Sequence, residues 1–190
     1  MTQLLLIRHG QTDFNDEGRL QGQLDIPLNK HGVEQARRTA QALKGAKIHA
    51  IYSSDLQRAR ATARELAEIT GLPVRIDPRL REVHLGDWQG KLAKDVQADE
   101  SDLYWHRRKY PAAVAPPGGE TALQVQERLL AAISDIVERH PDETVVIVSH
   151  GFAIAVMLAY FRDVPMSQVW SLVPENGQIY VVEVDQLPVG

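Results

Sequence analysis

The sequence contains no cysteine among its 190 residues. This absence excludes disulfide bonds, thiol nucleophiles and thiolate metal sites, and it fits a reducing compartment. The chain also lacks an excess of basic residues, because its formal net charge is -4 and its isoelectric point is about 6.0. We therefore expect no general attraction to nucleic acid or to an anionic membrane, and any anion site must be local.

Long apolar runs and familiar metal or nucleotide motifs are missing too. No basic segment precedes the first apolar run of the sequence, and this run is far shorter than the apolar core of a signal peptide or a membrane-spanning helix. We expect no membrane insertion and a cytoplasmic protein. The seven histidines show no His-x-His or HExxH spacing, and neither a Walker motif nor a Rossmann glycine fingerprint occurs. We therefore expect no bound metal and no nucleotide site of those two types.

What is present is an alternation of short apolar runs and amphipathic stretches, which predicts strands and helices in turn. Asn29 and Thr121 are expected to cap helices, the second with Gln124 in a capping box. With 44% hydrophobic residues the chain can build one substantial core. We predict one domain over residues 1–190 with an α/β fold, a three-layer α/β/α sandwich with a mostly parallel central sheet. The expected strands are residues 4–7, 50–53, 74–76, 145–148 and 178–184.

Residues 92–119 fit this alternation least. The segment holds aromatic and cationic side chains and ends in a Pro-Pro-Gly-Gly turn that must interrupt regular structure. We predict an insertion that caps the strand ends, whose rings and cations choose the leaving group of a substrate. The alternative is an ordinary amphipathic surface helix. The side chains concerned are Tyr104, Trp105, Arg107, Arg108 and Tyr110.

Two short segments, Arg-His-Gly at residues 8–10 and Ser-His-Gly at residues 149–151, each follow a predicted buried strand. In open α/β sheets, ligands bind in the crevice beyond the carboxyl ends of such strands. We therefore expect both ends of the chain to form one reaction centre that contains His9 and His150.

Cations near the predicted strand ends favour a phosphate group as ligand. Arg8 follows the first strand, and Arg58 lies in the first turn of a helix whose N-terminus adds partial positive charge. A neutral His9 could attack phosphorus, while a protonated His150 could stabilise the transferring group. The simpler alternatives are that Arg58 is one of several surface cations and that His9 is a hydrogen-bonded core residue.

A proton donor for the leaving oxygen is also needed. Glu82 follows the third predicted strand and could protonate that oxygen, then deprotonate the attacking water. The simpler alternative is a salt bridge from Glu82 to Arg79 or Arg81. Asp87 is a rival candidate for the same role.

Taken together, these residues make the chain resemble the histidine phosphatase superfamily, in its phosphoglycerate mutase-like branch. The similarity covers about residues 3–160, in segments that follow the family order. The segments are residues 6–12 (LIRHGQT), Asn15 with residues 18–22 (GRLQG), residues 52–59 (YSSDLQRA), 81–90 (REVHLGDWQG), 117–121 (PGGET) and 148–151 (VSHG).

The resemblance implies a phosphoglycerate mutase-like fold and a mechanism in which His9 becomes phosphorylated. It implies that Glu82 is the proton donor. Arg8, Arg58 and His150 would complete the phosphate pocket. Positions similar to those that contact phosphate or substrate in the family are Asn15, Gln21 and Gly22.

The family contains mutases and phosphatases, and the short segment after Glu82 is similar to the phosphatase branch. The resemblance therefore implies a metal-independent phosphomonoesterase that acts on a small phosphorylated metabolite without a cofactor. The alternatives are a 2,3-bisphosphoglycerate-dependent phosphoglycerate mutase and a non-catalytic phosphate-binding regulatory module. Trp170 and the last strand belong to the core or to an interface, and an open sheet edge there would permit a homodimer.

Overall fold

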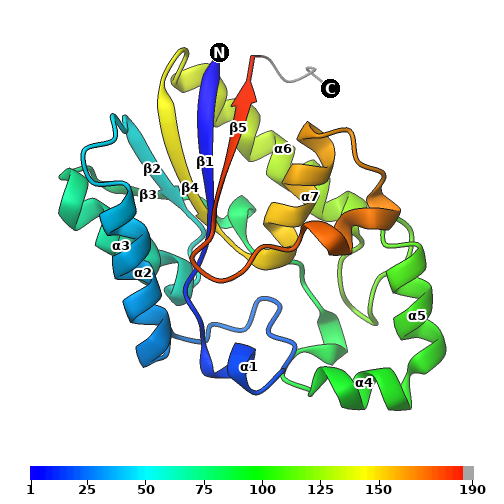
Figure 1. The fold of residues 1–190 in the computed structure, drawn as a ribbon. Coiled ribbons are helices and arrows are strands. Elements are labelled where there is room, and N and C mark those ends of the chain that lie inside the picture. The colour runs from blue at the N-terminus through cyan, green and yellow to red at the C-terminus, as the bar shows by residue number, and fades with distance from the viewer. Residues whose placement is uncertain (186–190) are drawn as a thin grey trace.

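The centre of the protein is a five-stranded sheet, seen in a computed structural model that describes residues 1–185 (Figure 1). Its strands are β1 (Thr2–Arg8), β2 (Ala50–Ser53), β3 (Val74–Ile76), β4 (Thr144–Ser149) and β5 (Ile179–Val184). They lie in the order β3-β2-β4-β1-β5, parallel except for β5, which pairs antiparallel with β1. The register pairs Arg8 with Ser149 and Ser53 with Val148, so β1, β2 and β4 end at one level.

Four helices cover the two faces of the sheet. They are α2 (Lys30–Ala42), α3 (Gln57–Thr70), α6 (Ala122–Arg139) and α7 (Gly151–Phe161). Helices α2 and α3 pack on the face that presents Leu5 and Ile7, whereas α6 and α7 pack on the face that presents Leu4 and Leu6 (Figure 1). Because successive strand residues point to opposite faces, the apolar run of β1 serves both cores. The predicted three-layer α/β/α architecture is confirmed.

Local signals set the ends of these helices. Asn29 Oδ1 accepts a hydrogen bond from the backbone N–H of Gly32 (2.8 Å) and caps α2. Thr121 and Gln124 form the predicted capping box of α6. Helix α3 ends at Gly71 in the left-handed conformation that glycine adopts most readily. All five predicted strands are present; β2 and β3 have the predicted bounds, and the ends of the other three shift by one or two residues.

The remaining elements are short and lie in the connections. They are α1 (Asp13–Asp16), η1 (Pro78–Leu80), η2 (Gly86–Trp88), α4 (Ala93–Asp99), α5 (Ser101–Lys109) and η3 (Met166–Leu172). Helices α1, α4 and α5 gather at the end of the molecule where the parallel strands finish, far from the N-terminus (Figure 1). Residues 92–119, the segment that fits the alternation of strands and helices least, contain the two helices α4 and α5. In the described part of the chain, no helix is both long and apolar enough to cross a membrane.

Candidate active site

His9 lies at the carboxyl end of β1 and is buried. Its Nδ1 is 2.6 Å from the carbonyl oxygen of Gly10, which assigns the ring proton to Nδ1. Arg58 Nε donates to His9 Nε2 over 3.2 Å, so Nε2 carries a lone pair. Burial, followed by the Arg58 and Arg8 charges, holds the pKa of His9 well below its ordinary value of 6.5. The ring is therefore neutral and presents one nucleophilic nitrogen.

His150 follows β4 and is fully buried beside His9, with 5.1 Å between the ring centroids. Its Nε2 is 2.8 Å from the hydroxyl of Ser54, and its Nδ1 has no partner among the described residues. Burial, followed by the Arg58 charge, lowers the pKa of His150 well below 6.5. The protonated form that was expected beside phosphate therefore requires the charge of the ligand itself.

Arg58 lies in the first turn of α3 and is only 1% exposed, so its interpretation as a surface cation is wrong. Its Nη1 and Nη2 donate to the carbonyl oxygens of Leu24 and Gly22 over 2.6 and 2.8 Å. Arg8 donates from Nη1 to the carbonyl oxygen of Pro174 (2.6 Å), and its Nε has no partner in residues 1–185. Burial lowers the pKa of both guanidinium groups, to about 10 for Arg58, and both stay charged at neutral pH.

Glu82 comes from the segment after β3 and meets the N-terminus of α7. Its Oε1 accepts hydrogen bonds from the backbone N–H groups of Val83 (2.9 Å) and Ala153 (3.0 Å). Its Oε2 accepts from the N–H of Phe152 (3.0 Å). The carboxylate thereby caps α7, because His150 at the N-cap position makes no side-chain cap hydrogen bond.

The two arginines beside Glu82 are paired with aspartates instead. Their ion pairs are Arg79–Asp77, Arg79–Asp135 and Arg81–Asp55. The alternative interpretation of Glu82 as their salt-bridge partner is therefore wrong. Asp87, the rival proton donor, is exposed and does not line the cavity that contains Glu82.

The three predicted substrate contacts surround the same space. Asn15 Oδ1 accepts from the backbone N–H of Thr12 (3.1 Å), and Gln21 Oε1 accepts from the Thr12 hydroxyl (2.9 Å). Both amide oxygens are thus used, and the amide nitrogens are the groups that can donate to a ligand. Gly22 has a φ of +52°, and a Cβ there would lie 2.3 Å from Gln89 Oε1, so this turn requires glycine.

These side chains line one cavity of about 400 Å³. The predicted residues on its surface are Arg8, His9, Asn15, Gln21, Gly22, Arg58 and Glu82. His150 is not part of that surface, since it is fully buried beside His9. The structure therefore brings the eight predicted residues together, and it forms the cavity from β1, α3, α7 and the loops between them.

Helices α5 and η3 also contribute to the cavity wall. Arg107 and Arg108 of α5 and Trp170 of η3 line it. The Arg107 guanidinium carbon is 4.9 Å from the centre of the Trp170 ring and 5.3 Å from that of Phe152. Burial lowers the pKa of Arg107 to about 10, against the opposing effect of the Glu82 charge. An arginine and a carboxylate thus line the same cavity.

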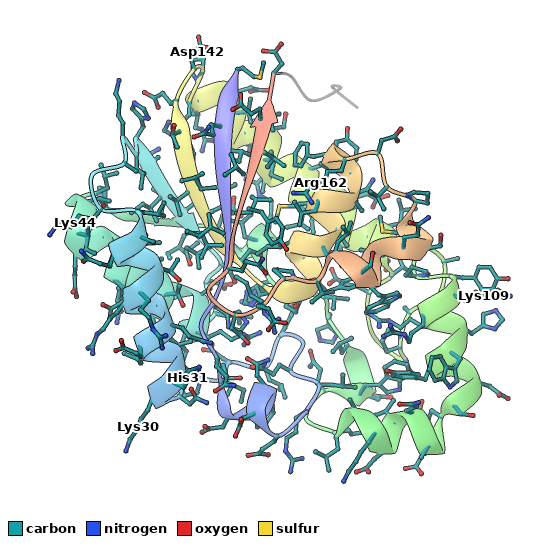
Figure 2. All side chains as sticks on the ribbon, in the orientation of Figure 1. Lys30, His31, Lys44, Lys109, Asp142 and Arg162 are labelled. Atoms are coloured by element: carbon teal, nitrogen blue, oxygen red, sulfur yellow. The ribbon has the colours of Figure 1, made fainter. Side chains whose placement is uncertain are left out.

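Only part of the predicted cap contacts this cavity. Tyr104 packs against the Trp88 ring, with 6.1 Å between centroids. Trp105 and Tyr110 are 53% and 46% exposed and do not line the cavity. Lys109, next to the two arginines in sequence, projects outward from the end of α5 (Figure 2). Of the five side chains, Arg107 and Arg108 therefore line the cavity, and Tyr104, Trp105 and Tyr110 do not.

Some contacts of the site were missed. Asn176 Nδ2 donates to the carbonyl oxygen of His9 (2.9 Å) from the turn before β5, where no motif marks it. Ser54 lies within the YSSDLQRA segment, so a polar side chain at the end of β2 was an available signal. Phe152, which lines the cavity and donates to Glu82, follows the second His-Gly pair, but no pattern around it indicates a contact with the site. Among the described residues, no three His, Asp or Glu side chains are grouped as a metal ion requires.

Comparisons with known proteins agree with this geometry. The family model of the histidine phosphatase superfamily (branch 1) matches residues 4–187. The chain is 41% identical over 174 residues to a glucosyl-3-phosphoglycerate phosphatase of Mycobacterium tuberculosis, covering 86% of this chain and 77% of the relative. It is 33% identical over 186 residues to phosphoserine phosphatase 1 of Hydrogenobacter thermophilus, covering 98% and 88%. Probable phosphoglycerate mutases are also among the relatives.

A solved structure extends the likeness to the whole fold. A mycobacterial glucosyl-3-phosphoglycerate phosphatase in complex with VO3 matches with a TM-score of 0.88 at 38% identity, covering 95% of this chain and 90% of that chain. The matched range of the family model contains every residue of the cavity described above. The chain belongs to the histidine phosphatase superfamily, branch 1.

Proposed function

We propose that this protein is a metal-independent phosphomonoesterase that hydrolyses a small phosphorylated metabolite through a phosphohistidine. The observation that carries the proposal is the lone pair on His9 Nε2, fixed by the Nδ1 hydrogen bond to Gly10 in a cavity that also contains Arg8, Arg58 and Glu82. A neutral ring nitrogen can attack phosphorus, and two fixed guanidinium groups can bind the phosphoryl oxygens. These cations supply the positive charge that a metal ion supplies in other phosphatases.

The proposed reaction has two steps. In the first, His9 Nε2 bonds to phosphorus, the bond from phosphorus to the ester oxygen breaks, and the Glu82 carboxylic acid gives its proton to the leaving oxygen. In the second, water attacks the phosphohistidine, Glu82 accepts a proton from the water, and the phosphorus–nitrogen bond breaks. The products are an alcohol and inorganic phosphate, and both His9 and Glu82 return to their starting forms.

We propose further that residues 92–119 act as a cap and that the alcohol part of the substrate carries an anionic group. Arg107 is 7% exposed, lies over aromatic rings and forms no ion pair with the described residues. A buried cation that forms no direct ion pair favours an anionic ligand. The substrates in the relatives' names, glucosyl-3-phosphoglycerate and phosphoserine, both contain a carboxylate.

A phosphate-release assay in the presence of EDTA tests this function. Wild-type protein should hydrolyse phosphoserine, 3-phosphoglycerate or glycerol 2-phosphate with the chelator present, and His9→Ala should abolish turnover. His31→Ala is the matched control, because His31 is exposed and points into solvent from the start of α2 (Figure 2). Arg107→Met should raise KM for the two carboxylate esters more than for glycerol 2-phosphate. Near wild-type turnover by His9→Ala would show that the mechanism is wrong.

A bisphosphoglycerate-dependent phosphoglycerate mutase is the competing function, because Arg107 and Arg108 could also hold a second phosphate. It requires a phosphoenzyme that survives until another hydroxyl group takes the phosphate. Interconversion of 2- and 3-phosphoglycerate that depends on 2,3-bisphosphoglycerate would favour the mutase. Phosphate binding without turnover would favour the regulatory module.

We also propose that a homodimer of this chain would form through β5. This strand lies at the edge of the sheet, and its Val181 side chain is 50% exposed. An uncovered edge strand offers backbone donors and acceptors to a second strand.

A further inference from the structure

The Pro-Gly-Gly-Glu-Thr segment at residues 117–121 has no role in the reaction proposed above. Its glutamate, Glu120, forms a bidentate pair with Arg128 of α6, with Arg128 Nε 2.9 Å from Oε1 and Nη2 2.9 Å from Oε2. Glu120 Oε2 also accepts from the backbone N–H of His84 (2.8 Å), and the Glu120 N–H donates to the His84 carbonyl (2.8 Å). Glu120 is thus attached to the chain two residues after Glu82.

The other donors of Arg128 reach the chain around Glu82. Its Nη1 donates to the carbonyl oxygens of Arg79 (2.8 Å) and Arg81 (2.7 Å), and Nη2 donates to that of Glu82 (2.9 Å). With the two bonds to Glu120, all five N–H donors of the guanidinium are used. Arg128 therefore has no donor left for a ligand, and its contacts fix the backbone.

The segment from Glu82 to His84 is therefore fixed by three sets of hydrogen bonds. Arg128 binds the carbonyl of Glu82, Glu120 binds the following backbone at His84, and the N-terminus of α7 binds the Glu82 carboxylate. A general acid must lie within hydrogen-bond reach of the leaving oxygen, and small displacements of a catalytic group reduce rates strongly.

We propose that the Glu120–Arg128 pair positions Glu82 for proton transfer. The inference rests on the proposed function, since it assumes that Glu82 is the acid. Lysine cannot replace Arg128 in this role, because an ammonium offers three donors from a single point and cannot bind three carbonyls and a carboxylate in one plane.

The dependence of kcat/KM on the leaving group distinguishes a role in positioning Glu82 from a purely structural role. p-Nitrophenyl phosphate releases a stable anion and needs little proton donation, whereas glycerol 2-phosphate releases an alkoxide that needs a proton. General acid catalysis contributes on the order of 100-fold or more, so Glu82→Gln should lower kcat/KM mainly for glycerol 2-phosphate. Arg128→Lys should lower kcat/KM for glycerol 2-phosphate about ten-fold more than for p-nitrophenyl phosphate.

Three further variants show whether a selective loss is specific to the Glu120–Arg128 pair and acts through Glu82. Arg139→Lys changes an exposed arginine on the same helix and should leave both values unchanged. Glu120→Gln keeps an oxygen for the His84 N–H but weakens the pair with Arg128, and it serves as the test if Arg128→Lys does not fold. In the double variant Glu82→Gln/Arg128→Lys, the second change should cause no further selective loss.

An equal loss for both esters in Arg128→Lys or Glu120→Gln would overturn the inference and leave the acid role of Glu82 intact. If Glu82→Gln itself shows no selective loss, the acid role and this inference both fail. The His9→Ala assay is independent of this result, so failure of the phosphohistidine mechanism remains distinguishable.

Discussion

Two imidazole rings and two guanidinium groups share one buried space at the strand ends. Burial lowers the pKa of all four groups, and the arginine charges lower those of the two histidines further. The native protein keeps both rings neutral while both arginines stay charged. Such a cluster costs stability without an anion, and phosphate supplies the missing negative charge.

We expect the stability of the unliganded protein to fall as pH decreases below about 6.5, the ordinary pKa of histidine. In that range the unfolded chain protonates His9 and His150, but the native protein does not, because both native pKa values are lowered. Each ring can contribute up to about 1.4 kcal/mol per pH unit until its own native pKa is reached. Above pH 6.5 this contribution is fully present. Urea unfolding at pH 7.5, 6.5 and 5.5 measures the slope.

The matched variants identify the source of this slope. His9→Gln/His150→Gln should flatten it, whereas His31→Gln should retain it, because His31 is exposed. The carboxylates Asp55, Asp77 and Glu120 have lowered pKa values and act near and below pH 4, outside this range. A slope unchanged by the double substitution would show that other groups cause it.

Helix α2 and the turn after β1 approach each other so closely that the contact requires glycine at residues 10 and 32. A Cβ at Gly32 would lie 2.0 Å from the carbonyl oxygen of Gln11, and one at Gly10 would lie 2.2 Å from that of Gly32. Asn29, which caps α2, also binds this turn, because its backbone N–H donates to the Gln11 carbonyl over 3.0 Å. The first turn of α2 therefore buttresses the backbone that orients His9.

Gly32→Ala should destabilise the protein by about 1–3 kcal/mol, because the added methyl forces α2 away from the turn. It should also lower kcat by moving the Gly10 carbonyl that holds His9 Nδ1. Lys30→Ala is the control, since Lys30 lies in the same turn of α2 and projects into solvent (Figure 2). Denaturant unfolding and phosphate-release kinetics measure both effects. Wild-type stability in Gly32→Ala would contradict the proposed close contact.

Elements with strong local signals were predictable, and those without them were not. The strands of the sheet have β-branched apolar runs, and α2 and α6 have caps and apolar periodicity. In helix α5 the one buried residue is Arg107, a charged residue that no apolar periodicity marks as buried. The short helix η1 packs against α6, and η2 is bonded to the loop at Pro117 through the Asp87 N–H. These segments needed tertiary contacts to take their form.

The sheet of the whole molecule has β3 at one edge and β5 at the other. If β5 mediates the proposed homodimer, Val181→Lys should shift the protein toward monomer, because edge lysines oppose strand pairing. Leu123→Lys is the control, as an exposed apolar residue on α6. Sedimentation velocity across a concentration series measures the change. A dimer that persists in Val181→Lys, or a wild-type monomer at all concentrations, would rule out pairing through β5.

The sequence by itself determined the architecture and the chemical inventory of the candidate site. Strand periodicity, helix caps and the residue types after the strands depend on neighbours a few positions away, so they are visible in one chain. These patterns suffice to indicate Arg8, His9, Arg58, Glu82 and His150 as candidate site residues.

Only the tertiary structure decided how these groups are used. The capping of α7 by Glu82 joins residues 71 positions apart, and the Asn176 contact with His9 spans 167. Likewise, packing of α5 against η3 determined that Arg107 and Arg108 face the cavity while Trp105 faces solvent. These contacts and side-chain orientations depend on the distances and the desolvation that folding creates between remote segments, and no local sequence pattern encodes them.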